Sequence, residues 1–358
     1  MQLSQDIKYL LSEGTVIPAH PLALHEDRSL NEAGQRLLTQ YYMAAGSGGI
    51  AVGVHTTQFE IRNPETDLLR PVLQLAAEEI ARVKTPANFI KVAGICGNTA
   101  QALHEARLAV DCGYHLGLVS PGGLRNMSEA EILRHIADIA QVIPVFGFYL
   151  QPAVGGRVFS YSFWRAFAEI KNVHAIKVAA FSRYQTLDVV RAVAGSERSN
   201  DIALYTGNDD NIVADLITPF RLQANGKPVV KHFSGGLLGH WAVWTKAAVK
   251  LFAEIKAFQR HGAGNASALL QKGAAVTDMN AAIFDPANHF HGCIPGIHQV
   301  LYQQGLMKGT WCLRADEKLS EGQQAEIDRV RAAYPDQIDD VFVADFLKSR
   351  NMEGNPVR

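Results

Sequence analysis

Short apolar runs alternate with helix-like patterns along the first 258 residues of the chain. Apolar runs bounded by turn residues predict strands, and apolar positions spaced three and four residues apart predict helices. The predicted strands cover 15–24, 49–54, 89–96, 115–120, 143–151, 173–180, 202–206 and 229–233. The predicted helices cover 29–45, a segment after Pro64, 99–111, a segment capped by Ser128, 161–170, 183–194, a short segment ending at Ile217, and 241–258. Two of these helix starts, Ser29 with Glu32 and Ser128 with Glu131, have capping-box spacing.

Eight consecutive strand–helix units imply parallel strands with right-handed crossovers. Eight units in about 250 residues are typical of a (β/α)₈ TIM barrel. A doubly wound sheet would favour a G-x-G-x-x-G turn after its first strand, and the chain has none there. Helices at 266–281, 297–304, 320–333 and 339–349, without a convincing strand, predict a C-terminal helical extension. We therefore expect an α/β barrel over residues 1–262 and a helical extension over 263–358, packed on the barrel or on a neighbouring subunit.

Composition and charge narrow the possible partners. The 358 residues are 47% hydrophobic and 19% charged, with a formal net charge of −1 and no basic block. This balance disfavours nucleic acid and acidic membrane surfaces as partners. No apolar run approaches ~18 residues, the length of a membrane span. The N-terminus has no secretory pattern and the four cysteines form no C-x-x-C pair, so we expect a cytoplasmic protein with reduced thiols.

Lys177, in the apolar run Ala175–Ala180, is the residue that a plain core would not choose. Burial favours the neutral amine of a lysine, and lowering its pKa to about 7–8 costs roughly 4 kcal/mol. A neutral amine is a nucleophile that can form a Schiff base with a carbonyl. The alternative is a lysine that reaches solvent or pairs with a carboxylate. Lys231, in the middle of the eighth predicted strand, is a rival, whereas Lys91 belongs near the opposite end of its strand.

Polar residues follow several predicted strands, where the active sites of barrels lie. Tyr149 near the end of the fifth strand could relay a proton, or line the barrel with its hydroxyl bonded to backbone. Three loops could bind substrate: His55, Thr56 and Thr57 could hold a carboxylate; Gly207, Asp209 and Asp210 could hold sugar hydroxyls or a metal; and Ser234 and Gly235 could hold an anion. Each loop has a structural alternative, namely a helix-entry turn, helix capping and a tight turn. His289 and His291 lack further ligands at familiar spacing, so no metal site is predicted.

Three motifs resemble the dihydrodipicolinate synthase / N-acetylneuraminate lyase superfamily of class I Schiff-base aldolases. Tyr149-Leu-Gln-Pro152 resembles the family's Tyr-Asn-x-Pro. Lys177 follows Tyr149 by 28 residues, which is the family's spacing. Gly94-Ile-Cys-Gly-Asn-Thr99, followed by Gly113 and Pro121, is similar to its third and fourth units. The resemblance implies that Lys177 forms an imine with a 2-oxo acid, that Tyr149 shuttles a proton, and that 55–57 hold the carboxylate.

Departures from the family pattern help to distinguish the synthase branch of the superfamily from the lyase branch. His55-Thr-Thr-Gln-Phe-Glu60 keeps two threonines but lacks the family's Gly-Glu, and the loop at Pro121 lacks the tyrosine of the synthase branch. Pro152-Ala-Val-Gly-Gly156 and Gly207-Asn-Asp-Asp210 are similar to the lyase branch. The resemblance therefore implies a cofactor-free lyase that cleaves or forms a C–C bond in a pyruvate-type, sugar-derived 2-oxo acid, in a homotetramer or homodimer.

Alternatives within and outside this superfamily remain open at this point. A dehydratase of a deoxy-oxo sugar acid and a 4-hydroxy-tetrahydrodipicolinate synthase would use the same imine. A metal-dependent barrel enzyme would use Asp209, Asp210 and histidines as ligands, and a barrel without activity would only bind a metabolite.

Overall fold

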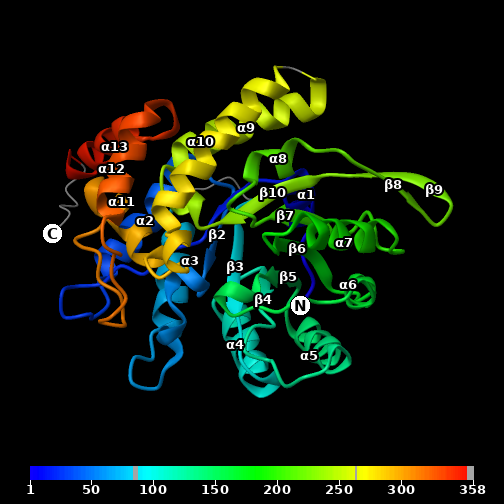
Figure 1. The fold of residues 1–358 in the computed structure, drawn as a ribbon. Helices are drawn as coiled ribbons and strands as arrows, with labels where there is room; N and C mark the ends of the chain where they lie inside the picture. The colour runs from blue at the N-terminus through cyan, green and yellow to red at the C-terminus, as the bar shows by residue number, and fades with distance from the viewer. Residues whose placement is uncertain (84–87, 263, 353–358) are drawn as a thin grey trace. The chain divides into compact units, whose positions relative to one another are not determined.

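The computed structural model describes residues 1–83, 88–262 and 264–352. Eight parallel strands form a nearly closed barrel with helices between them, which confirms the predicted (β/α)₈ fold (Figure 1). The barrel strands are β1 (Val16–Pro18), β2 (Gly49–Val52), β3 (Ile90–Ile95), β4 (Leu116–Val119), β5 (Val145–Leu150), β6 (Val173–Ala179), β7 (Ala203–Thr206) and β10 (Phe233–Leu238).

The predicted helices are present, and two of them match the prediction at both ends. The helices are α1 (Gln5–Glu13), α2 (Glu32–Ala45), α3 (Leu69–Arg82), α4 (Thr99–Asp111), α5 (Glu129–Val142), α6 (Tyr161–Ala168), α7 (Arg183–Ala194), α8 (Ile212–Ile217), α9 (Thr245–His261), α10 (Ala266–Phe284), α11 (Cys293–Gln303), α12 (Gln323–Ala333) and α13 (Asp340–Met352). Ser128 and Glu131 form the predicted capping box. The predicted cap at Ser29 is wrong, because α2 begins after Asn31, whose side chain accepts a hydrogen bond from the Gly34 N–H.

The described residues cluster into two compact units. The first unit contains residues 1–15 and 88–237, and the second contains the described residues of 16–87 and 238–358. The predicted division at residue 262 follows a different boundary and stays a prediction. Residues 263 and 353–358 of the predicted extension lie outside the described part.

In the first unit, the strand order is β10-β7-β6-β5-β4-β3. The faces of β5 and β6 follow from Gly147. A Cβ at Gly147 would lie 2.3 Å from the Phe167 ring of α6, so this face of β5 packs under the helix layer. Side chains alternate between the two faces of a strand. Phe148 therefore points to the opposite face, into the barrel interior, and Tyr149 shares the helix-covered face with Gly147.

The predicted eighth strand is wrong. Residues 229–233 fall mostly in β9 (Lys227–Lys231), which pairs antiparallel with β8 (Phe220–Ala224) in a separate hairpin. Figure 1 shows this hairpin projecting away from the neighbouring strands of its unit. Asn225 and Gly226 form its turn, both with positive φ, as expected of an Asn-Gly hairpin turn. The barrel strand comes next, in β10, and includes the glycines that were expected to form a loop.

The hairpin also removes the rival lysine. Lys231 ends β9, and its amine donates a hydrogen bond to the Ser199 carbonyl. Its side chain therefore belongs to the hairpin and not to a barrel strand, which leaves Lys177 as the lysine late in a barrel strand of the described first unit.

In the second unit, helix α13 of the extension packs against α2. The Tyr41 hydroxyl of α2 donates to Asp339 at 2.7 Å, and the Gln304 amide donates to the same carboxylate at 2.8 Å. No strand occurs in the described residues after 258, as predicted. Within the described residues, no helix is long and apolar enough to cross a membrane.

The packing of Gly147 leads to a stability prediction. Gly147→Ala places a methyl group against the Phe167 ring, and overpacking of this kind costs about 1–3 kcal/mol of unfolding free energy. We expect a lower midpoint in urea denaturation. Phe167→Leu in the same chain makes room, so the double variant should lose less stability than the sum of the two single changes. Additive losses would show that Gly147 does not face α6.

Candidate active site

Lys177 lies late in β6 and points into the barrel interior. Parallel pairing sets Lys177 beside Phe148 on β5 and beside Tyr205 on β7. Residues paired in this way share one face of the sheet. Since Phe148 faces the interior, Lys177 does too, two residues before the strand ends at Ala179. Barrel active sites lie at this end of the strands.

The side chain of Lys177 is held between an aromatic ring and a glycine. Its Nζ lies 4.4 Å from the centre of the Phe148 ring. Gly207 follows the neighbouring strand β7, and a Cβ at this position would come within 2.5 Å of Lys177 Cε and 2.9 Å of Ala179 Cβ. Any side chain at position 207 would therefore displace the lysine.

These surroundings change the acidity of the amine. Burial lowers the pKa of Lys177 to about 8, and the Asp209 carboxylate opposes this shift. Lys177 is half-buried, so its amine is partly removed from water but can still be reached by a small molecule. A lysine with these properties supplies the neutral amine needed for attack on a carbonyl near physiological pH.

Asp209 is the acidic partner of Lys177. Burial raises the pKa of its carboxyl group, while the Lys177 ammonium lowers it and Asp210 raises it further. Asp209 is half-buried, whereas Asp210 is exposed and interacts electrostatically with Arg183. Because the two pKas approach each other from opposite sides, the pair titrates as a unit. The structure thus brings together three residues that the sequence predicted, namely Lys177, Gly207 and Asp209.

A buried polar network fixes the loop that carries Gly207 and Asp209. Asn208 accepts a hydrogen bond from Phe181 N at 2.9 Å and donates to Asp215 Oδ2 at 2.8 Å. Thr206 Oγ1 donates to the same carboxylate oxygen at 2.7 Å, and Arg183 forms an ion pair with Asp215. Asn208 and Asp215 are buried, so a fully bonded network of this kind holds the loop rigidly.

Sequence reasoning missed this network. A threonine that ends an apolar strand and an aspartate in the short helix after it were the only signals, and both are common. Phe181, with φ of +52°, is held by the Asn208 hydrogen bond in a conformation that non-glycine residues rarely adopt.

Tyr149 lies apart from this group in the register of the sheet. It pairs with Val178, one residue beyond Lys177, on the helix-covered face. Its ring packs 5.0 Å from Trp164 and 6.1 Å from Phe159, centre to centre. Burial raises the pKa of its phenol. The ring therefore packs under the helix layer and does not line the barrel interior. The predicted relay role draws no support from this register and stays a prediction.

The predicted carboxylate loop His55–Thr57 belongs to the second unit and forms a turn of 3₁₀-helix. Thr57 Oγ1 donates to the His20 carbonyl at 2.7 Å and accepts from Gly53 N at 3.0 Å. Thr56 Oγ1 donates to the same carbonyl at 3.3 Å. Both hydroxyls therefore have partners within the unit. Their role toward a substrate carboxylate, like that of His55, stays a prediction.

Ser234 and Gly235 lie inside strand β10 and not in a loop after a strand, so the premise of an anion site there is wrong. A Cβ at Gly235 would come within 2.4 Å of the Thr15 carbonyl oxygen and 2.9 Å of the Tyr205 ring. Gly235 is thus explained by the close approach of the backbone at Thr15. No cluster of three or more His, Cys, Asp or Glu side chains suited to a metal ion occurs among the described residues.

Comparisons with known proteins find similar sequences and similar folds. A sequence profile of the dihydrodipicolinate synthetase family matches residues 13–219. A 4-hydroxy-tetrahydrodipicolinate synthase from Aromatoleum aromaticum (strain DSM 19018 / LMG 30748 / EbN1) is 28% identical over 198 residues. That match covers 54% of this chain and 63% of the relative, so the chain spans less than two thirds of the relative's length.

Solved structures share the fold at lower identity. N-acetylneuraminate lyase from Fusobacterium nucleatum, complexed with pyruvate, superposes with a TM-score of 0.71 at 17% identity, covering 91% of this chain and 99% of the other. A dihydrodipicolinate synthase superposes with a TM-score of 0.70 at 15% identity, covering 90% and 99%. At these identities the likeness shows the fold alone.

The contact between Gly207 and Lys177 leads to a prediction about reactivity. Gly207→Ala places a methyl carbon within 2.5 Å of Lys177 Cε and so displaces the lysine side chain. We expect at least a tenfold slower reaction of the amine with a 2-oxo acid, since small misplacements of a reacting group cost this much or more. The measurement is the rate of adduct formation on Lys177 by mass spectrometry. The circular dichroism melting curve checks that the variant folds, and an unchanged rate in a folded variant would contradict the packing.

Proposed function

Because the chain belongs to the dihydrodipicolinate synthetase family, we propose that it is a Schiff-base lyase of the aldolase type that acts on a 2-oxo acid. The observation that carries the proposal is the Lys177 amine, which faces the barrel interior near the end of β6 with a lowered pKa. The relatives support the substrate class, since a similar lyase was solved with pyruvate.

The chemistry requires a neutral amine and a group that moves protons. Lys177 Nζ adds to the carbonyl carbon of the 2-oxo acid, and loss of water leaves an iminium ion. In the cleavage direction a base takes the proton of the C4 hydroxyl, and the C3–C4 bond breaks, so that C4 leaves as the carbonyl carbon of an aldehyde. The electron pair of the broken bond converts the iminium into an enamine. Protonation at C3 and hydrolysis then release the product and restore the lysine.

Asp209 is our candidate for the proton carrier. Its carboxyl group interacts with the Lys177 amine, and burial raises its pKa into the range where a general acid or base works at neutral pH. Thr206, Asn208 and Asp215 hold the loop beneath it. We assign Asp210, the exposed next residue, to contact with polar groups of the substrate.

Two enzyme alternatives share the imine. A dehydratase of a deoxy-oxo sugar acid and a 4-hydroxy-tetrahydrodipicolinate synthase would form the enamine by loss of a C3 proton, and product analysis separates them from the lyase. The homo-oligomeric state, a dimer or tetramer, remains a prediction for light scattering.

Trapping with borohydride tests the proposal. With pyruvate present, we expect a reduced adduct that peptide mapping places on Lys177, and complete loss of this adduct in Lys177→Ala. Lys231→Ala is the matched control, because that lysine lies on the hairpin and its loss should leave the adduct intact.

Tyr149→Phe separates the two possible roles of the tyrosine. Because the ring packs against Trp164 on the helix-covered face, we expect the adduct and most of the turnover to remain. Slow turnover with an intact adduct would instead support the relay that the family resemblance implies. An adduct on another lysine, or none at all, would refute the proposed function.

The pH dependence of amine reactivity is a second test. Only the neutral amine is acetylated, so brief acetic anhydride pulses on the free enzyme should label Lys177 with a midpoint near pH 8. Asp209→Asn removes the charge that stabilises the ammonium, so the midpoint should move to lower pH. Turnover should fall about 100-fold or more if Asp209 carries the proton. A midpoint that stays unchanged in this variant would show that the two groups do not interact.

A further inference from the structure

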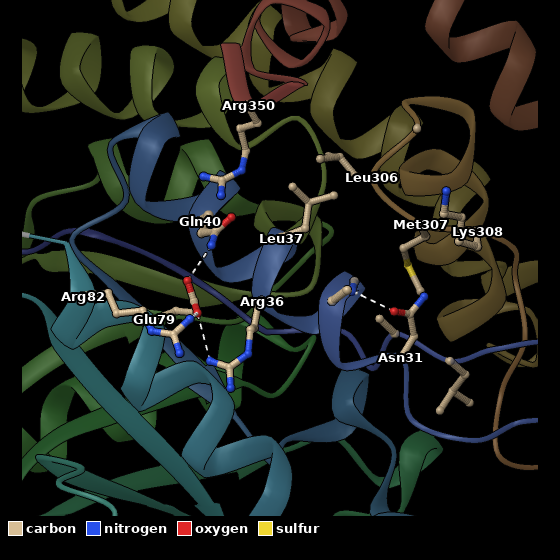
Figure 2. Close-up of a pocket in the computed structure, with 15 residues that line it drawn as sticks. Asn31, Arg36, Leu37, Gln40, Glu79, Arg82, Leu306, Met307, Lys308 and Arg350 are labelled. Atoms are coloured by element: carbon tan, nitrogen blue, oxygen red, sulfur yellow. Dashed lines mark hydrogen bonds and ion pairs between the residues drawn. The ribbon is translucent and has the colours of Figure 1, made fainter. Parts of the chain in front are cut away.

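A cavity in the second unit has no part in the chemistry described above. It measures about 210 Å³ and lies among α2, α3, the segment Gly305–Lys308 and Arg350 of α13 (Figure 2). None of its lining residues belongs to the group around Lys177.

The cavity is strongly cationic. Arg36, Arg82, Lys308 and Arg350 line it, and Glu79 is the one carboxylate among its lining residues. Glu78 also pairs with Arg36, so cations outnumber nearby carboxylates even when both glutamates are counted. Four cations in one small cavity repel each other unless an anion lies between them.

Glu79 acts as an anchor for two of these cations. It is only 2% exposed and accepts hydrogen bonds from Arg36 at 2.9 Å, Arg82 at 2.6 Å and Gln40 at 2.5 Å. Its charge is therefore fully engaged by the wall of the cavity, as Figure 2 shows. The guanidinium groups of Arg36 and Arg82 are held in place by this carboxylate, and each keeps further N–H donors.

The other two cations have no such anchor. Within the described part of the chain, neither Lys308 nor Arg350 has a carboxylate partner. Lys308 is exposed and Arg350 is half-buried, with its guanidinium 5.9 Å from the Phe346 ring. These two side chains come from the extension, whereas the anchored pair comes from α2 and α3. In Figure 2, Arg350 lies near Gln40, and Lys308 lies beside Met307.

Part of the lining of the cavity is apolar. Leu37, Leu306 and Met307 line it and are almost completely buried. An apolar lining lowers the local dielectric constant and strengthens the interactions between charges in the cavity. It also offers contact surface for a short carbon skeleton, whereas a volume below ~300 Å³ excludes a large ligand.

We propose that this cavity binds a small organic anion that carries a phosphate group or two carboxylates. Guanidinium groups match both of these anions with paired hydrogen bonds. The ligand would link α2 and α3 to Gly305–Lys308 and α13, and so tie the extension to the rest of its unit. Its role would be regulatory or stabilising, and it does not depend on the proposed lyase activity.

Calorimetric titration of the full chain with inorganic phosphate and with malonate, at constant ionic strength, tests this inference. We expect at least one of them to bind at millimolar concentration or tighter and to raise the melting temperature. Tighter phosphate binding indicates a phosphorylated ligand, and tighter malonate binding a dicarboxylate. Hydrogen exchange should slow at 305–308 on binding.

The variants use the two cations that hold no buried partner, so that Glu79 is not left uncompensated. Lys308→Gln with Arg350→Gln should weaken binding at least about fivefold, the loss of two charge-assisted contacts. Arg70→Gln with Lys250→Gln is the matched control, because it removes the same charge from exposed positions that do not line the cavity. Absence of binding by both anions, or equal binding by the two double variants, would overturn the proposal.

Discussion

The desolvation of one ammonium group is the constraint on which the candidate site depends. Holding Lys177 against Phe148 and Gly207 with its pKa near 8 costs on the order of 3 kcal/mol relative to a solvated lysine. The Asp209 carboxylate opposes this shift, so the cost would be larger without it. The neighbouring elements follow from this need. Gly207 leaves room for the methylene groups of Lys177. The hydrogen-bonded loop that contains Asn208 positions the Asp209 carboxylate.

The direction of the side chains on β5 and β6 decides which residues can share the chemistry. Val145 pairs with Val173, a separation of 28, but a shift in register follows, and Phe146 pairs with Ala175. With the earlier register Tyr149 would lie beside Lys177, as the spacing of the motif suggested. After the shift Phe148 takes that place, because one residue of slip moves every later side chain to the other face. Sequence spacing carries no information about such an irregularity.

Much of the fold could be predicted from the sequence because its helices are strongly periodic and well capped, as at Thr99–Asp111 and Arg183–Ala194. The eighth strand could not. Val229–Phe233 looks like a strand and is mostly one, but in a hairpin, and Asn225-Gly226 was the signal that could have revealed it. Gly235 looks like a loop residue by propensity, and only the approach of the Thr15 backbone explains it within a strand.

In the candidate site too, some residues could be predicted from the local sequence, whereas others depend on contacts between distant segments. Lys177 and Asp209 could be predicted because a charge in an apolar strand, or just after one, is unusual by itself. Asn208 and Asp215 could not be predicted, because they act by hydrogen-bonding each other and, in the case of Asn208, the Phe181 N–H, which is 27 residues away in the sequence. Such residues determine where the reacting groups lie without touching a substrate. The position of Asp209 beside the amine is therefore a property of the whole β6–α8 segment, and a matching motif at 207–210 alone would not reproduce it.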